Sequence, residues 1–212
     1  MTMIKTNKAG RSMIEMLGVL AIIGVLSVGG IAGYSKAMNK FKTNKVADNV
    51  SMLVTNIKTL YAQQNTYTGL KNKTAISMGV VPDELGTNET SGKLTNAFNG
   101  DVFIDVSGST NGDTSKAFII VFEKLSREAC ITLATNDWGS GYSSGLIAIQ
   151  ADGSDLGNKG GLDGVYIGNA GTENSIATPG GSTQSVPMAV TAAATACSCK
   201  QGNTCSIAWK YY

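Results

Sequence analysis

The chain has 212 residues, of which 42% are hydrophobic and 15% charged, with a formal net charge of +2 at pH 7. This composition excludes intrinsic disorder and allows one folded domain with an appendage. It also argues against nucleic acid as the main partner, since phosphate neutralisation requires a basic face or stripe. His is absent, which removes the commonest general base and nucleophile activator. We therefore expect a protein that is not an enzyme and has no cofactor or metal.

The first notable element is an uncharged segment, residues 16 to 35, rich in Leu, Ile, Val, Ala and Gly. About 20 such residues can cross a bilayer as a helix. The apolar run is longer than the core of a secretory signal peptide and continues into an amphipathic pattern. Lysines flank it on both sides, so the positive-inside rule leaves the orientation open. We expect a membrane span.

Residues after this span continue the helical pattern. Apolar side chains recur at spacings of four and three, at Val46, Val50, Leu53, Ile57 and Leu60. One face of the helix is therefore apolar and should pack on a folded domain. No Pro interrupts residues 11 to 65, which predicts one helix of about 80 Å. Its first half, 11–35, belongs in lipid, and its second half, 36–68, belongs on the domain and ends near the sequence "NTYTGL".

Three glycines, Gly29, Gly30 and Gly33, lie late in the apolar segment. Gly29 and Gly33 have the G-x-x-x-G spacing that allows close approach of helices in a membrane. Glycine is also common in membrane helices generally, and each one weakens a helix by about 1 kcal/mol relative to Ala. The pattern therefore leaves two interpretations open, helix packing and ordinary membrane composition.

An acidic residue, Glu15, stands at the start of the apolar segment. At the centre of a bilayer an ionised side chain costs about 2.5 to 3.5 kcal/mol on insertion scales, so such residues usually have a partner or a function. By position alone, Glu15 is equally well explained as an interfacial acid at the edge of the span.

Beyond Gly69 the composition changes to Gly, Ser, Thr and Asn, with short apolar stretches between turn signals. Five of these stretches predict strands: residues 101–106, 116–125, 145–150, 164–168 and 205–212. The segment 126–136 predicts a short helix with Ala129, Cys130 and Leu133 facing inward. Strands packed on a long amino-terminal helix give an α+β fold, in which residues 69–212 form the soluble domain.

Four cysteines, Cys130, Cys197, Cys199 and Cys205, lie in this domain, the last three within the sequence "CSCKQGNTC". An even number behind an export-like amino terminus indicates disulfides. Zinc is the alternative, but a zinc site would need distant Cys130 as the fourth ligand, with no His to help. Four cysteines allow three connectivities, which remain open at this point.

The sequence "GRSMIEMLGVLAIIGVLSVGGIAGY", residues 10–34, resembles the class III signal of type IV pilins and related pseudopilins. That signal has a short basic leader ending in Gly, a cleavage site, a Glu at mature position 5, an apolar helix and a Tyr at mature position 24. With Arg11 as the first mature residue, Glu15 and Tyr34 occupy these positions. The resemblance implies a leader, 1–10, that a prepilin peptidase removes between Gly10 and Arg11 on the cytoplasmic side.

The resemblance also assigns a role to Glu15. Its carboxylate would meet the new α-amino group of a neighbouring subunit in a growing filament. Two positions differ from the family pattern: Arg11 replaces the usual N-methylated Phe or Met, and Ala32 replaces the proline common in the type IVa branch. If the helix loosens on assembly, the cluster from Gly29 to Gly33 is the expected place.

The soluble domain resembles the type IVb branch, which includes the toxin-coregulated pilin. The similar features are "KAFIIVFEKLSREACITL" ahead of "IAIQADG", and the long separation from Cys130 to the cysteine cluster. The resemblance implies the type IV pilin fold, with a disulfide joining the carboxy-terminal region to the domain. We favour Cys130 with Cys197, and Cys199 with Cys205.

The expected function is a structural subunit of an extracellular type IVb-like pilus. The implied partners are other copies of the chain in a helical filament, the prepilin peptidase, the inner-membrane pilus assembly machinery and, before assembly, the membrane itself. The alternatives are a minor pilin or type II secretion pseudopilin that primes or tips a filament, or a membrane-anchored binding or hydrolase domain. Adhesion, aggregation, conjugation, motility and DNA uptake stay open as roles.

Overall fold

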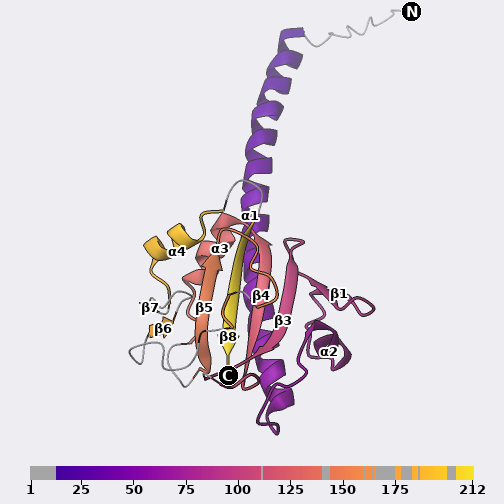
Figure 1. Cartoon of the computed structure of the whole chain (residues 1–212). Coiled ribbons are helices and arrows are strands. Elements are labelled where there is room, and N and C mark those ends of the chain that lie inside the picture. The colour runs from indigo at the N-terminus through magenta and orange to yellow at the C-terminus, as the bar shows by residue number, and fades with distance from the viewer. Residues whose placement is uncertain are drawn as a thin grey trace, which may run out of the picture. The chain divides into compact units, whose positions relative to one another are not determined.

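The computed structural model describes residues 13–110, 112–139, 144–159, 161–163, 165, 175–177, 183–185, 187–199 and 204–212 (Figure 1). The chain divides into two compact units, Met1–Asn39 and Lys40–Tyr212. The predicted leader and its cleavage site at Gly10 and Arg11 lie outside the described residues, as does nearly all of the predicted strand 164–168.

A single helix, α1 (Met13–Tyr61), runs from the first unit into the second. In the second unit one side of it is buried, at Thr43, Val46, Asn49, Val50, Leu53, Ile57 and Tyr61. The apolar face predicted from the spacing of four and three is therefore confirmed for all its members except Leu60, which is exposed. Helix propensity alone seldom stabilises a helix in water, so this packed face holds the second half in place.

Helix α1 ends at Tyr61, earlier than the predicted end near residues 65 to 68. The backbone N–H of Gln64 donates to the Tyr61 carbonyl at 2.8 Å and turns the chain. Tyr67 then packs its ring against Tyr61, with centroids 5.3 Å apart, and against Phe118 of the sheet, with centroids 4.8 Å apart. A continuing helix would carry Tyr67 away from the sheet, so this aromatic contact favours the earlier end.

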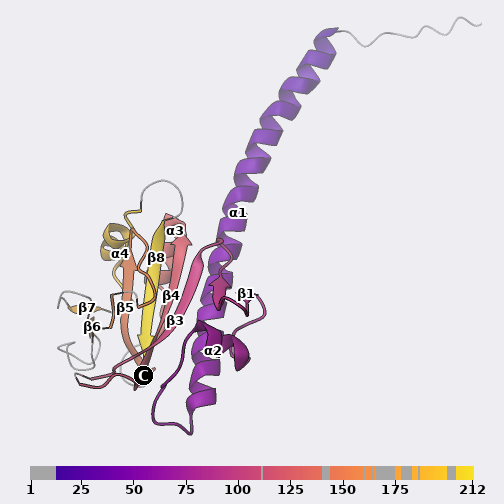
Figure 2. The ribbon, with the colours of Figure 1, turned by 45° about the vertical axis from the view of Figure 1, so that its right-hand side comes forward.

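The second unit contains a six-stranded antiparallel sheet (Figures 1 and 2). Its strands are β1 (Gly86–Asn88), β2 (Lys93–Thr95), β3 (Asp101–Ser107), β4 (Ala117–Leu125), β5 (Leu146–Asp152) and β8 (Cys205–Tyr211), in the order β1-β2-β3-β4-β8-β5. Four of the five predicted strands are therefore confirmed, with ends shifted by one or two residues. The carboxy-terminal strand β8 lies between β4 and β5, which sequence order does not reveal.

One face of the sheet is apolar and aromatic. The registered pairs Phe118 with Tyr211, and Ile120 with Trp209, place large side chains on the same face. The predicted helix 126–136 is α3 (Arg127–Ala134), and the Ser126 hydroxyl caps it by accepting from the Ala129 N–H at 3.2 Å. The residues predicted to face inward, Ala129, Cys130 and Leu133, are buried.

The opposite face carries polar side chains covered by a segment that we call the strap, the described residues from 157 to 163. The N–H of Gly157 donates to Glu123 Oε1 of β4 at 2.7 Å, and Asn158 Nδ2 donates to Asp105 Oδ2 of β3 at 3.0 Å. Lys210 Nζ of β8 donates to the carbonyls of Leu162, at 3.0 Å, and Asp163, at 3.2 Å. These bonds satisfy polar groups that the strap removes from water.

Several short elements were not predicted: α2 (Asn72–Ser77), β1, β2, the hairpin of β6 (Ser175–Ala177) with β7 (Thr183–Ser185), and α4 (Val190–Ala196). The three-residue strands are too short to show a period of two. Helix α2 is placed by Asn72, whose Nδ2 donates to the Val102 carbonyl at 2.7 Å and whose Oδ1 accepts from the Ile104 N–H at 2.6 Å. Such long-range contacts leave no local pattern.

Candidate assembly site

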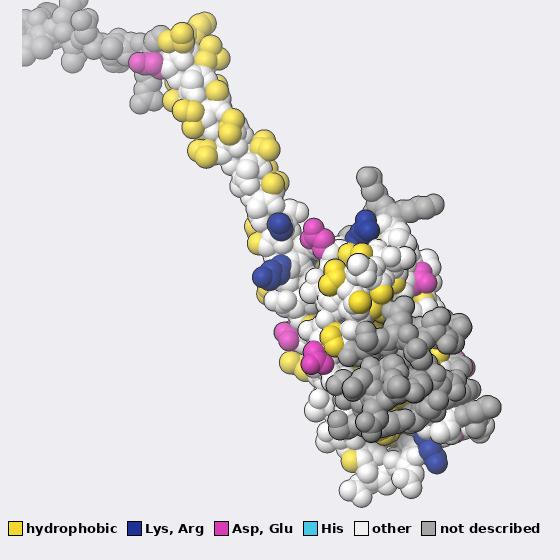
Figure 3. Space-filling model, turned by 90° about the vertical axis from the view of Figure 1, so that its left-hand side faces the viewer, with side chains coloured by type: hydrophobic (Ala, Val, Ile, Leu, Met, Phe, Trp, Pro, Cys, Tyr) yellow, Lys and Arg dark blue, Asp and Glu magenta, His cyan; other side chains and the backbone are white. Residues whose placement is uncertain are grey.

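Large apolar side chains stand exposed along α1 between Met13 and Tyr34, and Figure 3 shows one face of this segment. Its exposed large side chains are Met13, Ile14, Met16, Leu17, Val19, Leu20, Ile22, Ile23, Val25, Leu26, Val28, Ile31 and Tyr34. By length and composition the helix could cross a membrane, and none of its most apolar window is buried within the structure. A helix that is hydrophobic all round belongs in lipid or in the interior of an assembly. This surface therefore requires an external partner.

Glu15 lies in the first turn of α1, and its side chain is exposed. A carboxylate is favourable there because it faces the positive end of the helix dipole. The described residues include no hydrogen-bond or ion-pair partner for it. The structure thus leaves the Glu15 carboxylate accessible near the amino-terminal end of an otherwise apolar surface.

Glu15 and the three glycines share one face of the helix. Glu15 and Gly33 are 18 residues apart, about five turns at 3.6 residues per turn, so they project in the same direction. By the same geometry Gly29 and Gly30 lie within about 60° of that direction, one on each side. A Cβ added at any of the three glycines would meet no atom within 4 Å. The result is a shallow strip, Gly29, Gly30 and Gly33, in line with the acid and open to a neighbouring helix.

The second unit is closed by two disulfides. Cys130 of α3 is bonded to Cys197, which follows α4, with Cα atoms 5.9 Å apart and a sequence separation of 67. Cys199 is bonded to Cys205, the first residue of β8, with Cα atoms 5.2 Å apart and a separation of 6. These are the two pairs favoured in the sequence analysis, and they join α3, α4 and β8.

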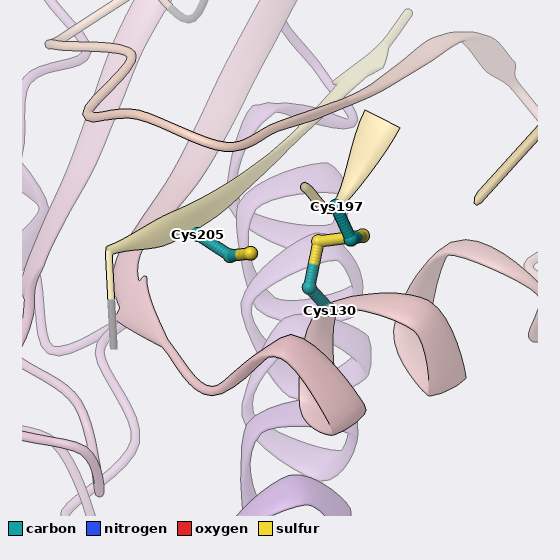
Figure 4. A group of neighbouring side chains, drawn as sticks. All are labelled: Cys130, Cys197 and Cys205. Carbon is teal, nitrogen blue, oxygen red and sulfur yellow. A yellow bond between two sulfur atoms is a disulfide. The ribbon is translucent and has the colours of Figure 1, made fainter. Parts of the chain in front are cut away.

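The two disulfides lie next to each other. The sulfur atoms of Cys130, Cys197 and Cys205 are all within 4.8 Å of one another (Figure 4). Within the part of the chain that the structure describes, these three cysteines are the group whose ligand atoms are close enough to hold a metal ion. Each of the three sulfurs is, however, bonded in a disulfide. The sequence spacing gave no signal that Cys205 would lie beside the other bond.

Lys210 is a second feature that sequence reasoning missed. It is 0% exposed, on the inner strand β8, although a lysine in a strand is usually exposed to solvent. Burial lowers its pKa from 10.5 to about 8, while the nearby Asp163 acts in the opposite direction. The carbonyls of the strap, which Lys210 holds, lie far from β8 in the sequence, so no local signal could have found it.

Comparisons with known proteins give consistent matches. The family model described as PilS N terminal matches residues 40–210. The chain is 28% identical over 136 residues to the major structural subunit of bundle-forming pilus of Escherichia coli O127:H6, covering 64% of this chain and 68% of that protein. It is 30% identical over 156 residues to the toxin coregulated pilin of Vibrio cholerae, covering 71% and 66%.

Two solved structures are also similar. The type IVb pilin from Salmonella typhi aligns with a TM-score of 0.47 at 16% identity, covering 77% of this chain and 95% of that one. The type IV pilin TcpA of Vibrio cholerae El Tor aligns with a TM-score of 0.46 at 15% identity, covering 81% and 99%.

Proposed function

Since the chain belongs to the PilS N terminal family of pilins, we propose that it is a structural subunit of an extracellular type IVb-like pilus that polymerises through α1. The relatives that match are pilus subunits, two of them described as major structural subunits. The observation that carries the proposal is the exposed surface of α1 from Met13 to Tyr34, which is apolar apart from Glu15, Ser27 and its glycines. A filament core supplies the cover that this surface requires.

In this proposal the chain is first a prepilin in the bacterial inner membrane, with the first half of α1 in lipid. A prepilin peptidase cuts between Gly10 and Arg11, and Arg11 becomes the first residue of the mature chain. The pilus assembly machinery then moves this half of α1 from lipid into a fibre. Each subunit contacts the next through different surfaces, a heterologous contact that does not close and so grows into a filament.

Glu15 sets the register of this contact. The α-amino group of one subunit lies beside the Glu15 carboxylate of its neighbour, so two buried opposite charges compensate each other, whereas either one alone is penalised. A register shifted along the helix would leave both charges unpaired in an apolar core, so the acid disfavours the wrong arrangements. Support comes from the accessible position of Glu15 in the first turn.

The strip of Gly29, Gly30 and Gly33 allows a neighbouring helix to come close on the same face as Glu15. Close approach increases van der Waals contact, which drives helix association where water contributes no hydrophobic force. Support comes from the open space at each of these glycines.

The test replaces Glu15. We expect Glu15→Ala and Glu15→Gln to be processed and inserted in the membrane but to form no filaments, because an unpaired α-amino group would remain in the fibre core. Filaments are counted by electron microscopy and pilin is quantified in sheared surface fractions. The matched control is Glu89→Ala, at an exposed position between β1 and β2, which should assemble normally. Wild-type piliation by both Glu15 variants would refute the role of Glu15.

The mature amino terminus separates this function from the others. A membrane-anchored binding or hydrolase domain would keep its first ten residues, whereas a pilin or pseudopilin begins at Arg11. Mass spectrometry of the amino-terminal peptide from purified membranes distinguishes the two. Abundance then separates a major from a minor subunit, since a major pilin dominates the sheared surface fraction.

A further inference from the structure

Three cysteines associated with three different elements meet at one place in the soluble unit. Cys130 comes from α3, Cys197 follows α4, and Cys205 begins β8. All three are 0% exposed. In Figure 4 the side chain of Cys205 points toward the Cys130–Cys197 bond, and the three sulfurs lie within 4.8 Å of one another. Cys205 is therefore placed beside a disulfide to which it does not belong.

We propose that this cluster is an internal thiol–disulfide exchange site, in which Cys197 and Cys205 are alternative partners of Cys130. A chain that first forms Cys130–Cys205 would then reach the native pairing without unfolding. The bond between Cys199 and Cys205 acts as the lock, because Cys205 cannot attack its neighbour while it is bonded to Cys199.

The exchange step balances without any oxidant. The Cys197 thiolate attacks the Cys130 sulfur of a Cys130–Cys205 bond, the Cys130–Cys197 bond forms, and Cys205 leaves as a thiolate. One disulfide is broken and one is made. Locking is a separate oxidation, in which the Cys199 and Cys205 thiols lose two electrons and two protons to an external protein disulfide of the kind found in oxidising compartments.

Position favours Cys205 over Cys199 as the internal nucleophile. Cys199 is only partly buried, so its thiol would be the more accessible one to solvent and reagents. It is nevertheless absent from the group of three sulfurs within 4.8 Å. Proximity and chemical accessibility therefore predict opposite results for these two cysteines, and the experiment can separate them.

The experiment uses the full-length chain purified in detergent, with Cys199→Ser, which frees the Cys205 thiol. Samples are acid-quenched, alkylated and mapped by mass spectrometry of the linked peptides. We expect two species, Cys130–Cys197 and Cys130–Cys205, which return to the same ratio after either is isolated. The thiolate is the nucleophile, and its fraction grows as the pH rises. At pH values below the thiol pKa, the rate of re-equilibration should therefore increase about tenfold for each unit by which the pH is raised.

The matched control is Cys205→Ser, which frees the Cys199 thiol instead. We expect this variant to keep Cys130–Cys197 alone at every pH. Exchange in Cys205→Ser that equals or exceeds that in Cys199→Ser would overturn the proposal, because accessibility rather than placement would then decide. A single Cys130–Cys197 species in Cys199→Ser at all pH values would also overturn it.

A second measurement covers variants that fail to fold. The wild-type chain is treated with limiting dithiothreitol, and the species with two free thiols are isolated and mapped over time. We expect Cys130–Cys205 to appear together with the species that retains Cys130–Cys197. If Cys130–Cys205 does not form in molecules whose Cys199–Cys205 bond is reduced, the proposed exchange site is refuted.

Discussion

At the residue scale, the most informative side chain is Lys210, the buried amine of β8. Its Nζ holds the strap through the Leu162 and Asp163 carbonyls. Burial disfavours the charged form, which is why its pKa falls from 10.5 to about 8. The amine that binds the strap to the sheet is therefore one whose protonated form is destabilised by burial in the folded protein.

This pKa has a consequence for stability. Between pH 8 and 10.5 the unfolded chain binds a proton at Lys210 that the folded chain has released, so the free energy of unfolding should rise with pH. We expect a difference in slope between the wild type and Lys210→Met of up to about 1.4 kcal/mol per pH unit. Denaturant titrations at several pH values from 7.5 to about 9.5 measure it.

The control for this prediction is Lys93→Met. The Lys93 side chain is 57% exposed and pairs with Asp101 at 2.9 Å, so its removal should leave the slope of the wild type above pH 8 nearly unchanged. The pH range stops near 9.5 because burial also raises the pKa of Tyr211. Above that pH the unfolded chain would lose the Tyr211 proton before the folded chain does, which lowers the free energy of unfolding and would mask the effect of Lys210. Equal slopes for the wild type and Lys210→Met would contradict the predicted titration.

At the element scale, the β2–β3 turn is fitted tightly against β4. Asn96 Nδ2 donates to the Glu123 carbonyl at 2.8 Å, and Asn96 Oδ1 accepts from the N–H of Gly100 at 3.1 Å. A Cβ at Gly100 would overlap the backbone carbonyl of Glu123. Glycine is therefore required at this position for close approach of two backbones.

We expect Gly100→Ala to lower the free energy of unfolding by roughly 2 to 3 kcal/mol, since the turn and β4 must separate and the Asn96 bonds weaken. Gly86→Ala in β1 is the control. Its added Cβ would come no closer than 3.4 Å to Thr95, so its effect should stay within about 0.5 kcal/mol. Denaturant unfolding followed by tryptophan fluorescence reports both, and similar losses in the two variants would contradict the argument.

Also at this scale, long elements were predicted better than short ones. The apolar face of α1 is long enough to show its helical period, and β3, β4, β5 and β8 are apolar stretches of seven to nine residues between turn signals. Helix α4 consists largely of Ala and Thr, which shows no such pattern. It is placed by the Cys130–Cys197 bond and by Arg127, whose guanidinium donates to the Ala194 carbonyl at 3.4 Å.

At the scale of the whole molecule, the two disulfides constrain very different lengths of chain. Cys130 and Cys197 are separated by 67 residues, whereas Cys199 and Cys205 are separated by 6. In the chain-entropy model a cross-link stabilises by restricting the unfolded ensemble, and the gain increases with loop length. The long bond should therefore contribute more to a fibre that meets shear and proteases.

We expect the double variant Cys130→Ser with Cys197→Ser to lose about 4 kcal/mol of unfolding free energy, and Cys199→Ser with Cys205→Ser to lose about 2 kcal/mol. Each double variant removes one disulfide and two sulfur atoms from the same region of the domain, so each variant serves as the control for the other. Denaturant midpoints of the full chain in detergent measure the difference. A larger loss from the short pair would show that local contacts, not loop length, set the contribution.

The amino-acid sequence by itself determined the long helix, its apolar first half, the position of Glu15 and most strands, because these depend on local order and period. It also favoured the two cysteine pairs, through resemblance to the pilin family.

Tertiary structure decided the rest: the end of α1 at Tyr61, the place of β8 between β4 and β5, the burial of Lys210 and the approach of Cys205 to the second disulfide. Each of these depends on contacts between residues far apart in the chain. Such contacts form only when the sheet closes around its last strand, so no local pattern carries them.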